Sequence, residues 1–152
     1  MLFNSYYTNG KDRGYQSRDL EWSKDFEEFA AAHPDGVQQT YLQSMVDALD
    51  RFLADRRREG ITVVLVYSPE YFKALDMIKN REEIFSIYRR LASKYQVAFL
   101  DYSYDAMSYD TKYFYNSQHL NKTGAELFSA RLAGTLTSLV APAEVAVKQG
   151  LR

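Results

Sequence analysis

Two short apolar runs constrain the fold of this chain more than any other feature. Residues 61–67 read ITVVLVY, and residues 97–101 read VAFLD. Neither run alternates between apolar and polar side chains, which is typical of strands covered on both faces. The segment between them is long enough for a helix, and parallel strands need such a crossover because a tight turn cannot join them. The sequence therefore predicts a parallel sheet with helices on its faces.

Helical patterns precede the first run. Residues 21–32 predict a short helix that ends at the turn signal of residues 33–36, HPDG. Residues 38–58 carry leucine, methionine, valine and phenylalanine at helical spacing, which indicates a long amphipathic helix. Gly60 stands where the C-terminus of that helix is expected.

A second set of helical signals lies between the two runs. Residues 71–77 predict a short helix or turn. Asn80, with Glu83 three residues later, has the spacing of a capping box that opens a longer helix. Residues 1–20 and 141–152 show no clear periodicity, and we expect an irregular lead-in and a loose tail.

The stretch from residue 113 to 132, YFYNSQHLNKTGAELFSARL, has the chemistry that best suits a site. Asn121 is a good N-cap, and Phe128 and Leu132 recur at helical spacing. His119 therefore lies just before a helix N-terminus, where the positive end of the helix dipole favours the neutral imidazole that acts as a base. The alternative is that His119 only makes local hydrogen bonds in a helix-entry loop.

Polar and aromatic side chains follow both predicted strands. Ser68 comes after the first strand, and Asp101 and Tyr102 come at the end of the second. The loop of residues 102–116 then leads through Tyr115 towards His119. Because ligands bind beyond the carboxyl ends of parallel strands, we expect these residues to contact a substrate.

Composition excludes several classes of site. The 152 residues fit a single domain, and they include no cysteine and only two histidines, without the spacing of metal ligands. We therefore expect no metal and no cofactor. Nineteen basic and 20 acidic side chains give a net charge of −1, which argues against nucleic acid as a partner. No apolar run predicts a membrane span, and the start shows no signal-peptide pattern, so the compartment stays open.

The segment FYNSQHLNKTGAELFSARL, with VVLVYSPEY and VAFLDYS upstream, resembles the C-terminal half of SGNH (GDSL-like) hydrolases. It is most similar to bacterial SGNH-like proteins related to polysaccharide acyl esterases and acetyltransferases. The resemblance implies a flavodoxin-like three-layer α/β/α sandwich, with a small and incomplete parallel sheet, and a Ser-His-Asp triad. It implies that His119 is the catalytic base, that Asn116 stands in the place of the triad's acidic residue, and that the substrate is an acylated carbohydrate or another small ester.

Two departures from that family predict weak or absent activity. No Gly-Asp-Ser block, the family's nucleophile motif, occurs in this sequence. Asn116 can accept a hydrogen bond from the imidazole but supplies no negative charge, and Asp to Asn at this position costs a serine protease about 10⁴-fold in turnover. We therefore expect a truncated or degenerate domain that is inactive alone.

The sequence leaves substitutes for the missing groups open. No candidate serine lies in a Gly-x-Ser-x-Gly elbow; the candidates near the predicted edge are Ser68, Ser103, Ser108 and Ser117. Three carboxylates are alternative partners for the imidazole: Asp101, Asp105 and Asp110.

A second hypothesis is a non-catalytic module on the same scaffold, which binds a glycan or a protein. Its contact residues would be the tyrosines of the loop, Tyr102, Tyr104, Tyr109, Tyr113 and Tyr115. The alternative, which we prefer slightly, is that most of these rings only anchor the loop. An incomplete sheet would also expose a strand edge and apolar helix faces, which predicts either a homodimer or an N-terminal segment rearranged to cover the gap.

Overall fold

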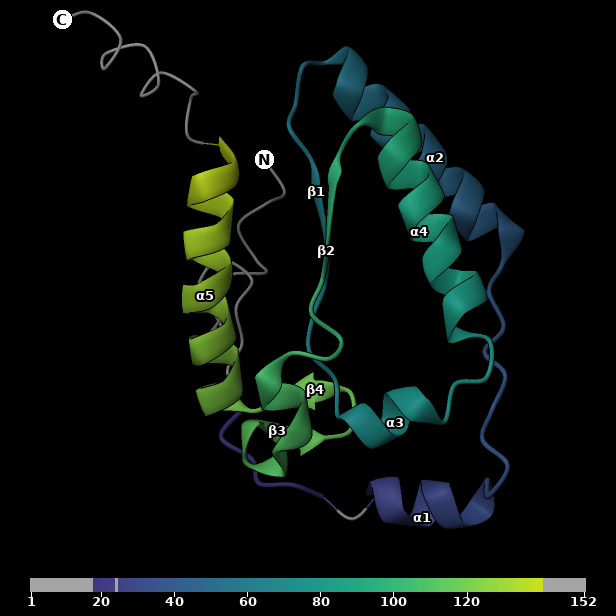
Figure 1. The fold of residues 1–152 in the computed structure, drawn as a ribbon, viewed down its shortest axis with the longest axis vertical. Coiled ribbons are helices and arrows are strands. Elements are labelled where there is room, and N and C mark those ends of the chain that lie inside the picture. Colours follow the sequence, from purple (N-terminus) through teal and green to yellow (C-terminus); the bar gives the residue numbers. More distant parts are fainter. Residues whose placement is uncertain (1–17, 24, 141–152) are drawn as a thin grey trace, which may run out of the picture.

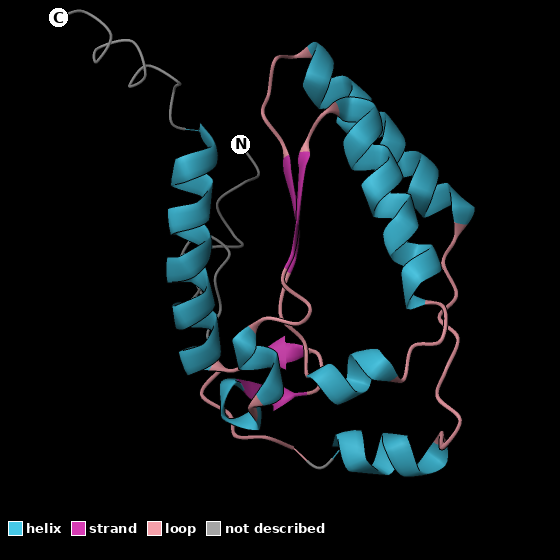
Figure 2. Ribbon diagram, viewed as in Figure 1, coloured by secondary structure: helices cyan, strands magenta, loops and turns pink. Residues whose placement is uncertain are grey.

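The structure, a computed structural model, describes residues 18–23 and 25–140. These residues form a mixed α/β fold with five α-helices and two small sheets (Figures 1 and 2), so the predicted α/β class is confirmed. The lead-in before residue 18 and the tail after residue 140 lie outside the described residues. The elements in chain order are α1 (Asp25–Ala32), α2 (Gln43–Arg58), β1 (Val64–Tyr67), α3 (Phe72–Asp76), α4 (Arg81–Tyr95), β2 (Ala98–Asp101), the 3-10 turns η1 (Ala106–Tyr109) and η2 (Thr111–Tyr113), β3 (Phe114–Asn116), β4 (His119–Leu120) and α5 (Lys122–Val140).

The two predicted strands pair in parallel, as the sequence indicated. Val64 of β1 lies opposite Ala98 of β2, and the register continues to Tyr67 opposite Asp101. α4 makes the crossover between them, and α2 and α4 lie on one side of the pair with α5 on the other side (Figure 1). Phe85 of α4 is buried against the rings of Tyr67 and Phe99, so this side of the sheet carries much of the core.

The expectation that both strands are covered on both faces is wrong. Residues 64, 65 and 67 of β1 are half-buried, and Val66 is 38% exposed. The side chains of Tyr67 and Phe99 point to α4, so Val66, one position before Tyr67, points to the opposite face. On that opposite side α5 packs mainly against η2 and β4, beyond the carboxyl ends of the strands, rather than along the sheet.

Tertiary pairing shortens the predicted α2. The helix begins at Gln43 instead of Gln38, because the chain around Val37 pairs in extended form with the segment after α3. The Val37 N–H donates to the carbonyl of Met77 at 2.8 Å, and the Val37 carbonyl accepts from the Lys79 N–H at 2.8 Å. Gly60 adopts a positive φ of 71° after α2, which confirms the predicted stop.

The two predicted N-caps have different outcomes. Asn121 caps α5 as predicted, since its Oδ1 accepts from the Gly124 N–H at 3.0 Å. Asn80 occupies the position before α4 but makes no side-chain cap bond, so the capping box is wrong. Its amide instead forms two hydrogen bonds with the backbone of Gln39, both at 2.9 Å, and Glu83 accepts from the hydroxyl of Tyr41. Both side chains hold α4 to the chain that precedes α2.

The predicted loop of residues 102–116 is more ordered than the sequence suggested. It contains η1 and η2, whose N-caps are the carboxylates of Asp105 and Asp110, and it ends in β3. β3 pairs with β4 in an antiparallel hairpin that places His119 directly opposite Asn116. A Cβ on Gly124 would lie 2.1 Å from the carbonyl oxygen of Tyr113, so only glycine permits α5 to approach the hairpin this closely.

Candidate functional site

The hairpin brings His119 and Asn116 into direct contact. His119 Nδ1 lies 2.9 Å from Asn116 Oδ1. The same oxygen accepts from the backbone N–H of Gln118 at 3.1 Å. Because a backbone N–H only donates, this contact fixes the amide orientation, and His119 Nδ1 must be the donor to that oxygen. A neutral His119 then carries its lone pair on Nε2, the nitrogen that faces away from Asn116.

Tyr115 packs against one face of the imidazole ring. The rings of Tyr115 and His119 are stacked, with centroids 5.4 Å apart and an interplanar angle of 17°. The guanidinium carbon of Arg18 lies 5.8 Å from the centroid of the same tyrosine ring. The hairpin itself is fixed from two sides, since the Tyr115 carbonyl accepts from the Ser23 N–H and the Ser117 carbonyl accepts from the Tyr71 N–H. His119 is thus exposed but held in orientation.

A surface depression of about 220 Å³ lies beside the imidazole. Its floor and walls come from the hairpin, from the residues that follow β1, and from the chain before α1. The lining residues are Arg18, Ser68, Pro69, Tyr115, Gln118, His119 and Leu120. Of the residues predicted from sequence, His119, Ser68 and Tyr115 therefore line one depression. Asn116 does not line it but binds the imidazole of His119.

Asp101 and Tyr102 do not line this depression. Strand alternation explains the position of Asp101: it lies opposite Tyr67 in the register and points with it towards α4, whereas Ser68 is one position further along. The Asp101 carboxylate contacts Arg81 at 3.4 Å and accepts from the backbone N–H of Ser103 at 3.0 Å. Tyr102 donates to Thr135 of α5 at 3.1 Å and packs edge-on against Phe128.

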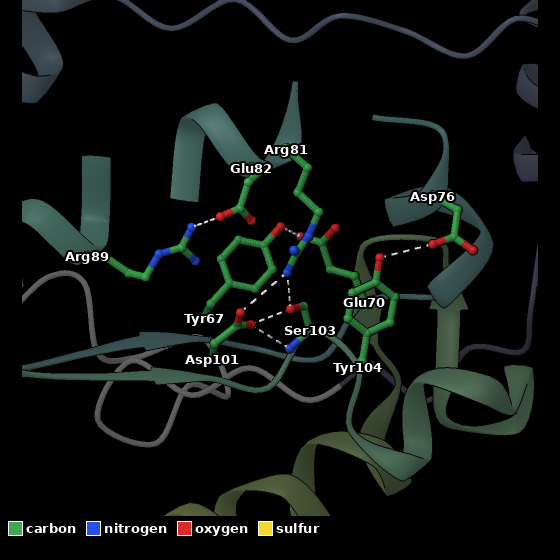
Figure 3. A network of polar contacts seen from close by, with 9 residues as sticks. All are labelled: Tyr67, Glu70, Asp76, Arg81, Glu82, Arg89, Asp101, Ser103 and Tyr104. Carbon is green, nitrogen blue, oxygen red and sulfur yellow. Dashed lines mark hydrogen bonds and ion pairs between the residues drawn. The ribbon is translucent and has the colours of Figure 1, made fainter. Parts of the chain in front are cut away.

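Arg81 is the centre of the network around Asp101 (Figure 3). Its side chain is 17% exposed, and it donates to the carboxylate of Asp101 and to the hydroxyl of Ser103. Its guanidinium carbon lies 3.8 Å from the centroid of Phe85 and 5.0 Å from that of Tyr104. A half-buried cation needs such partners, and the network joins the end of β2 to the start of α4.

Glu70 lies at the border of this network. Its Oε1 accepts from the hydroxyl of Tyr67 at 2.9 Å. Burial raises the pKa of Glu70, and the bond from Tyr67 and the charge of Arg81 offset part of that rise. Burial and the neighbouring Glu70 carboxylate raise the pKa of Tyr67, so its hydroxyl keeps its proton and remains a donor.

Burial separates the four candidate serines. Ser103 is 1% exposed and Ser108 is 0% exposed, so neither hydroxyl meets a substrate. Ser117 lines a different depression of about 330 Å³, on the α1 and α3 side of the hairpin turn. Ser68 is exposed and lines the depression of His119, which makes it the one candidate of the four that shares this site.

The alternative carboxylate partners for His119 are all engaged elsewhere. Asp101 binds Arg81, Asp105 pairs with Arg131 of α5, and Asp110 pairs with Lys112 at 2.6 Å. Asn116 is the residue that contacts the imidazole.

Arg18 and Gln118 belong to the site but were not predicted. Arg18 lies in a segment without periodicity, and nothing in its neighbours indicates that its carbonyl accepts from the Lys122 N–H at 2.9 Å. Among the described residues no group of three or more histidine, aspartate or glutamate side chains is arranged to hold a metal ion. No helix within residues 18–23 and 25–140 is long and apolar enough to cross a membrane.

Comparisons of the chain with protein-family models, with curated proteins and with solved structures found no match. The assignment of a role to this depression therefore rests on its residues and their geometry.

Proposed function

We propose that the depression is part of the site of an SGNH-like ester hydrolase or acyltransferase, and that an acylated carbohydrate or another small ester is the substrate. The contact between His119 Nδ1 and Asn116 Oδ1 carries this proposal, because it leaves the lone pair of Nε2 directed away from the protein partner. A base of this kind is what attack by a hydroxyl on an ester requires.

The chemistry assigns one role to each residue. His119 Nε2 takes the proton of an attacking hydroxyl while that oxygen bonds to the acyl carbonyl carbon. When the tetrahedral intermediate collapses, the same nitrogen returns the proton to the departing alkoxide, so the imidazole ends neutral. Asn116 positions the ring but adds no negative charge beside the imidazolium, so we expect low turnover even with a complete site.

The attacking hydroxyl has two possible sources. Ser68 shares the depression with His119, but it follows β1 without the glycines of a nucleophile elbow. The other source is a polypeptide segment outside the described residues or in another chain. We favour a hydroxyl from such a segment, and the activity of Ser68→Ala distinguishes the two sources.

The experiment that tests the proposed base is a two-bond ¹H–¹⁵N correlation spectrum of the imidazoles at about pH 8, where histidine is neutral. We expect His119 to be the Nδ1–H tautomer, and Asn116→Ala to return it to the mixture seen in free histidine. His33 is the internal reference, since its Nδ1 contacts the Phe29 carbonyl and does not involve Asn116. An Nε2–H tautomer of His119 in the unaltered chain would contradict the proposal.

Hydrolysis of a short acyl ester is the functional arm of the same test. Any turnover of the intact chain should be lost in His119→Ala and kept in His33→Ala. Turnover that survives His119→Ala would exclude this imidazole as the base, and loss of turnover in Ser68→Ala would identify Ser68 as the nucleophile.

The second candidate function is a non-catalytic module that binds a glycan or a protein. The exposure of Tyr109 favours it: the ring is 55% exposed and packs on Phe72 with centroids 4.8 Å apart. Tyr104 is also exposed, and its hydroxyl donates to Asp76. Tyr109→Ala, compared with His119→Ala, distinguishes this function, because only the former would weaken glycan or protein binding.

We also propose that a second copy of the chain completes a flavodoxin-like three-layer sandwich. Within the described residues β1 and β2 pair with each other and with no further strand, and Val66 and Ile61 are exposed beside them. Light scattering should therefore give the mass of a dimer; a stable monomer at high concentration would argue against this assembly.

A further inference from the structure

The depression beside His119 has an unbalanced charge. Of the described residues that line it, Arg18 is the one with a full charge. Three further lining residues have a polar hydrogen, namely Ser68 and Tyr115 in their hydroxyls and Gln118 in its amide, whereas the N–H of neutral His119 is bound to Asn116. Among the described residues no carboxylate lines this depression, whereas Asp25 and Glu70 both line the one on the other side of the hairpin turn.

Arg18 also differs from other arginines of the molecule. Arg81, the first residue of α4, and Arg131, in the middle of α5, each pair with an aspartate. In the part of the chain that the structure describes, no carboxylate oxygen lies within 4.0 Å of the Arg18 guanidinium. Its known contacts are the Tyr115 ring, 5.8 Å from the guanidinium carbon, and the bond from Lys122 N–H to its carbonyl. Among the described residues, none of the five N–H groups of this side chain has a hydrogen-bond acceptor.

The position of Arg18 is fixed by the same elements that fix His119. Its backbone is held at the start of α5, and its guanidinium lies over the ring that stacks on the imidazole. An anion that contacts the guanidinium in the depression therefore lies beside His119. Arginine binds carboxylate and phosphate groups through two parallel N–H bonds, which gives both charge and orientation.

We propose that this depression binds a small oxyanion, a carboxylate or phosphate group, through Arg18 with help from Ser68 and Gln118. Its volume of about 220 Å³ is below the range of about 300 to 1,000 Å³ that encloses drug-sized ligands, so it takes one head group rather than a whole sugar. For the proposed function, on which this part rests, the substrate is an ester that carries an acidic group next to its acyl linkage.

Binding is tested without catalysis by NMR of the intact chain. Sodium acetate and, separately, inorganic phosphate replace sodium chloride at constant ionic strength, and the ring resonances of the two histidines are followed. We expect saturable shifts of the His119 resonances and none for His33, which lies at the end of α1 on the carbonyl of Phe29. The stronger of the two titrations identifies the oxyanion as carboxylate or phosphate.

Two charge-matched variants provide the control. Arg18→Gln should weaken the binding by about tenfold, the loss of one charge-assisted contact. Arg51→Gln removes the same charge from the exposed face of α2 and should leave the titration unchanged. Equal shifts of both histidines, or equal titrations of the two variants, would overturn the proposal by showing only non-specific screening.

A second measurement separates this inference from the proposed function. If acetate or phosphate binds through Arg18 but no ester is hydrolysed, the oxyanion site stands and the esterase proposal fails. If hydrolysis depends on His119 but Arg18→Gln has the same preference for acidic over neutral esters as the unaltered chain, the oxyanion site fails and the esterase proposal stands.

Discussion

The ends of β1 and β2 leave the same edge of the sheet and meet different surroundings. β2 ends in a network in which Asp101, Ser103 and Arg81 bind one another under α4 (Figure 3). β1 ends at Ser68, which is exposed in the depression with His119. The end of β2 is charged and partly buried, and its carboxylate, hydroxyl and guanidinium bind one another, although Arg81 Nε has no partner among the described residues. The end of β1 is exposed, and no hydrogen bond to the Ser68 hydroxyl is formed within the described residues. The difference shows that polar residues which follow parallel strands at one edge can be paired within the protein or exposed to solvent, and that contacts with neighbouring elements decide which.

The largest effect on stability should come from Gly124, the glycine at which α5 packs closely against the chain of the hairpin. In Gly124→Ala the new Cβ would lie 2.1 Å from the Tyr113 carbonyl oxygen, so α5 and the His119 hairpin must separate, and we expect a loss of about 3 kcal/mol in urea unfolding. Gly134→Ala is the matched control, because nothing lies within 4 Å of its Cβ. In that helical position alanine should stabilise by about 0.5 to 1 kcal/mol. Equal effects of the two variants would mean that α5 does not rest on the hairpin as described.

The next largest effect should come from the closed end of β2. Arg81→Met removes the cation that donates to the Asp101 carboxylate and the Ser103 hydroxyl, so both lose a hydrogen-bond donor. We expect the free energy of unfolding to fall by about 2 kcal/mol. Arg89→Met breaks the exposed pair with Glu82 and should cost less than about 0.5 kcal/mol. Chemical denaturation of both variants measures the contrast. If Arg81→Met costs no more than Arg89→Met, the network around Arg81 contributes no more to stability than an exposed ion pair.

A pair of serine variants compares the two ends directly. Ser103→Ala removes a buried hydroxyl that contacts Asp101 and Arg81, and it should destabilise by about 1 kcal/mol. Ser68→Ala removes an exposed hydroxyl and should change the free energy of unfolding by less than about 0.5 kcal/mol. Thermal unfolding of both variants shows which substitution destabilises the protein more. The reverse order would contradict the assignment of β2 to structure and β1 to the site.

The smallest effect concerns Glu70, which lies between the two ends. Its pKa in the folded protein is raised above the ordinary value of 4.5, so the folded state holds this proton more tightly than the unfolded chain. The stability it contributes is therefore present below pH 4.5 and is lost as the pH rises through the raised pKa.

Glu70→Gln should consequently be more stable than the unaltered chain at neutral pH, by less than about 1 kcal/mol because water screens a partly exposed group. Below pH 4.5 the two proteins should converge. Urea unfolding across this pH range measures the difference, and Glu126→Gln on the exposed face of α5 is the control. A Glu70→Gln variant that loses stability at neutral pH would mean that the carboxylate is stabilising there.

Local patterns predicted the five helices and the parallel pair of strands, but not all of their ends, and they did not predict η1, η2 or the β3–β4 hairpin. The apolar runs before Ser68 and Asp101 became the parallel pair, and Asn121 became the cap of α5. The start of α2 and the role of Asn80 were wrong, because the chain at Val37 and Gln39 forms hydrogen bonds with residues about 40 positions away. No short window of sequence contains such a partner.

The candidate site shows the same division. His119 and Asn116 are three residues apart, so their contact follows from the local motif and the hairpin that contains it. Arg18 joins them only because its carbonyl binds the N-terminus of α5, more than a hundred residues away. Asp101 was removed from the predicted set by the alternation of β2, which points it towards Arg81.

Sequence alone therefore defined the class of the fold and the imidazole with its amide partner, since hydrophobic periodicity and capping are local properties of the chain. The packed structure decided which polar side chains became buried partners and which remained free at the surface. That distinction depends on desolvation and on hydrogen bonds between distant segments, and both exist only once the chain has folded.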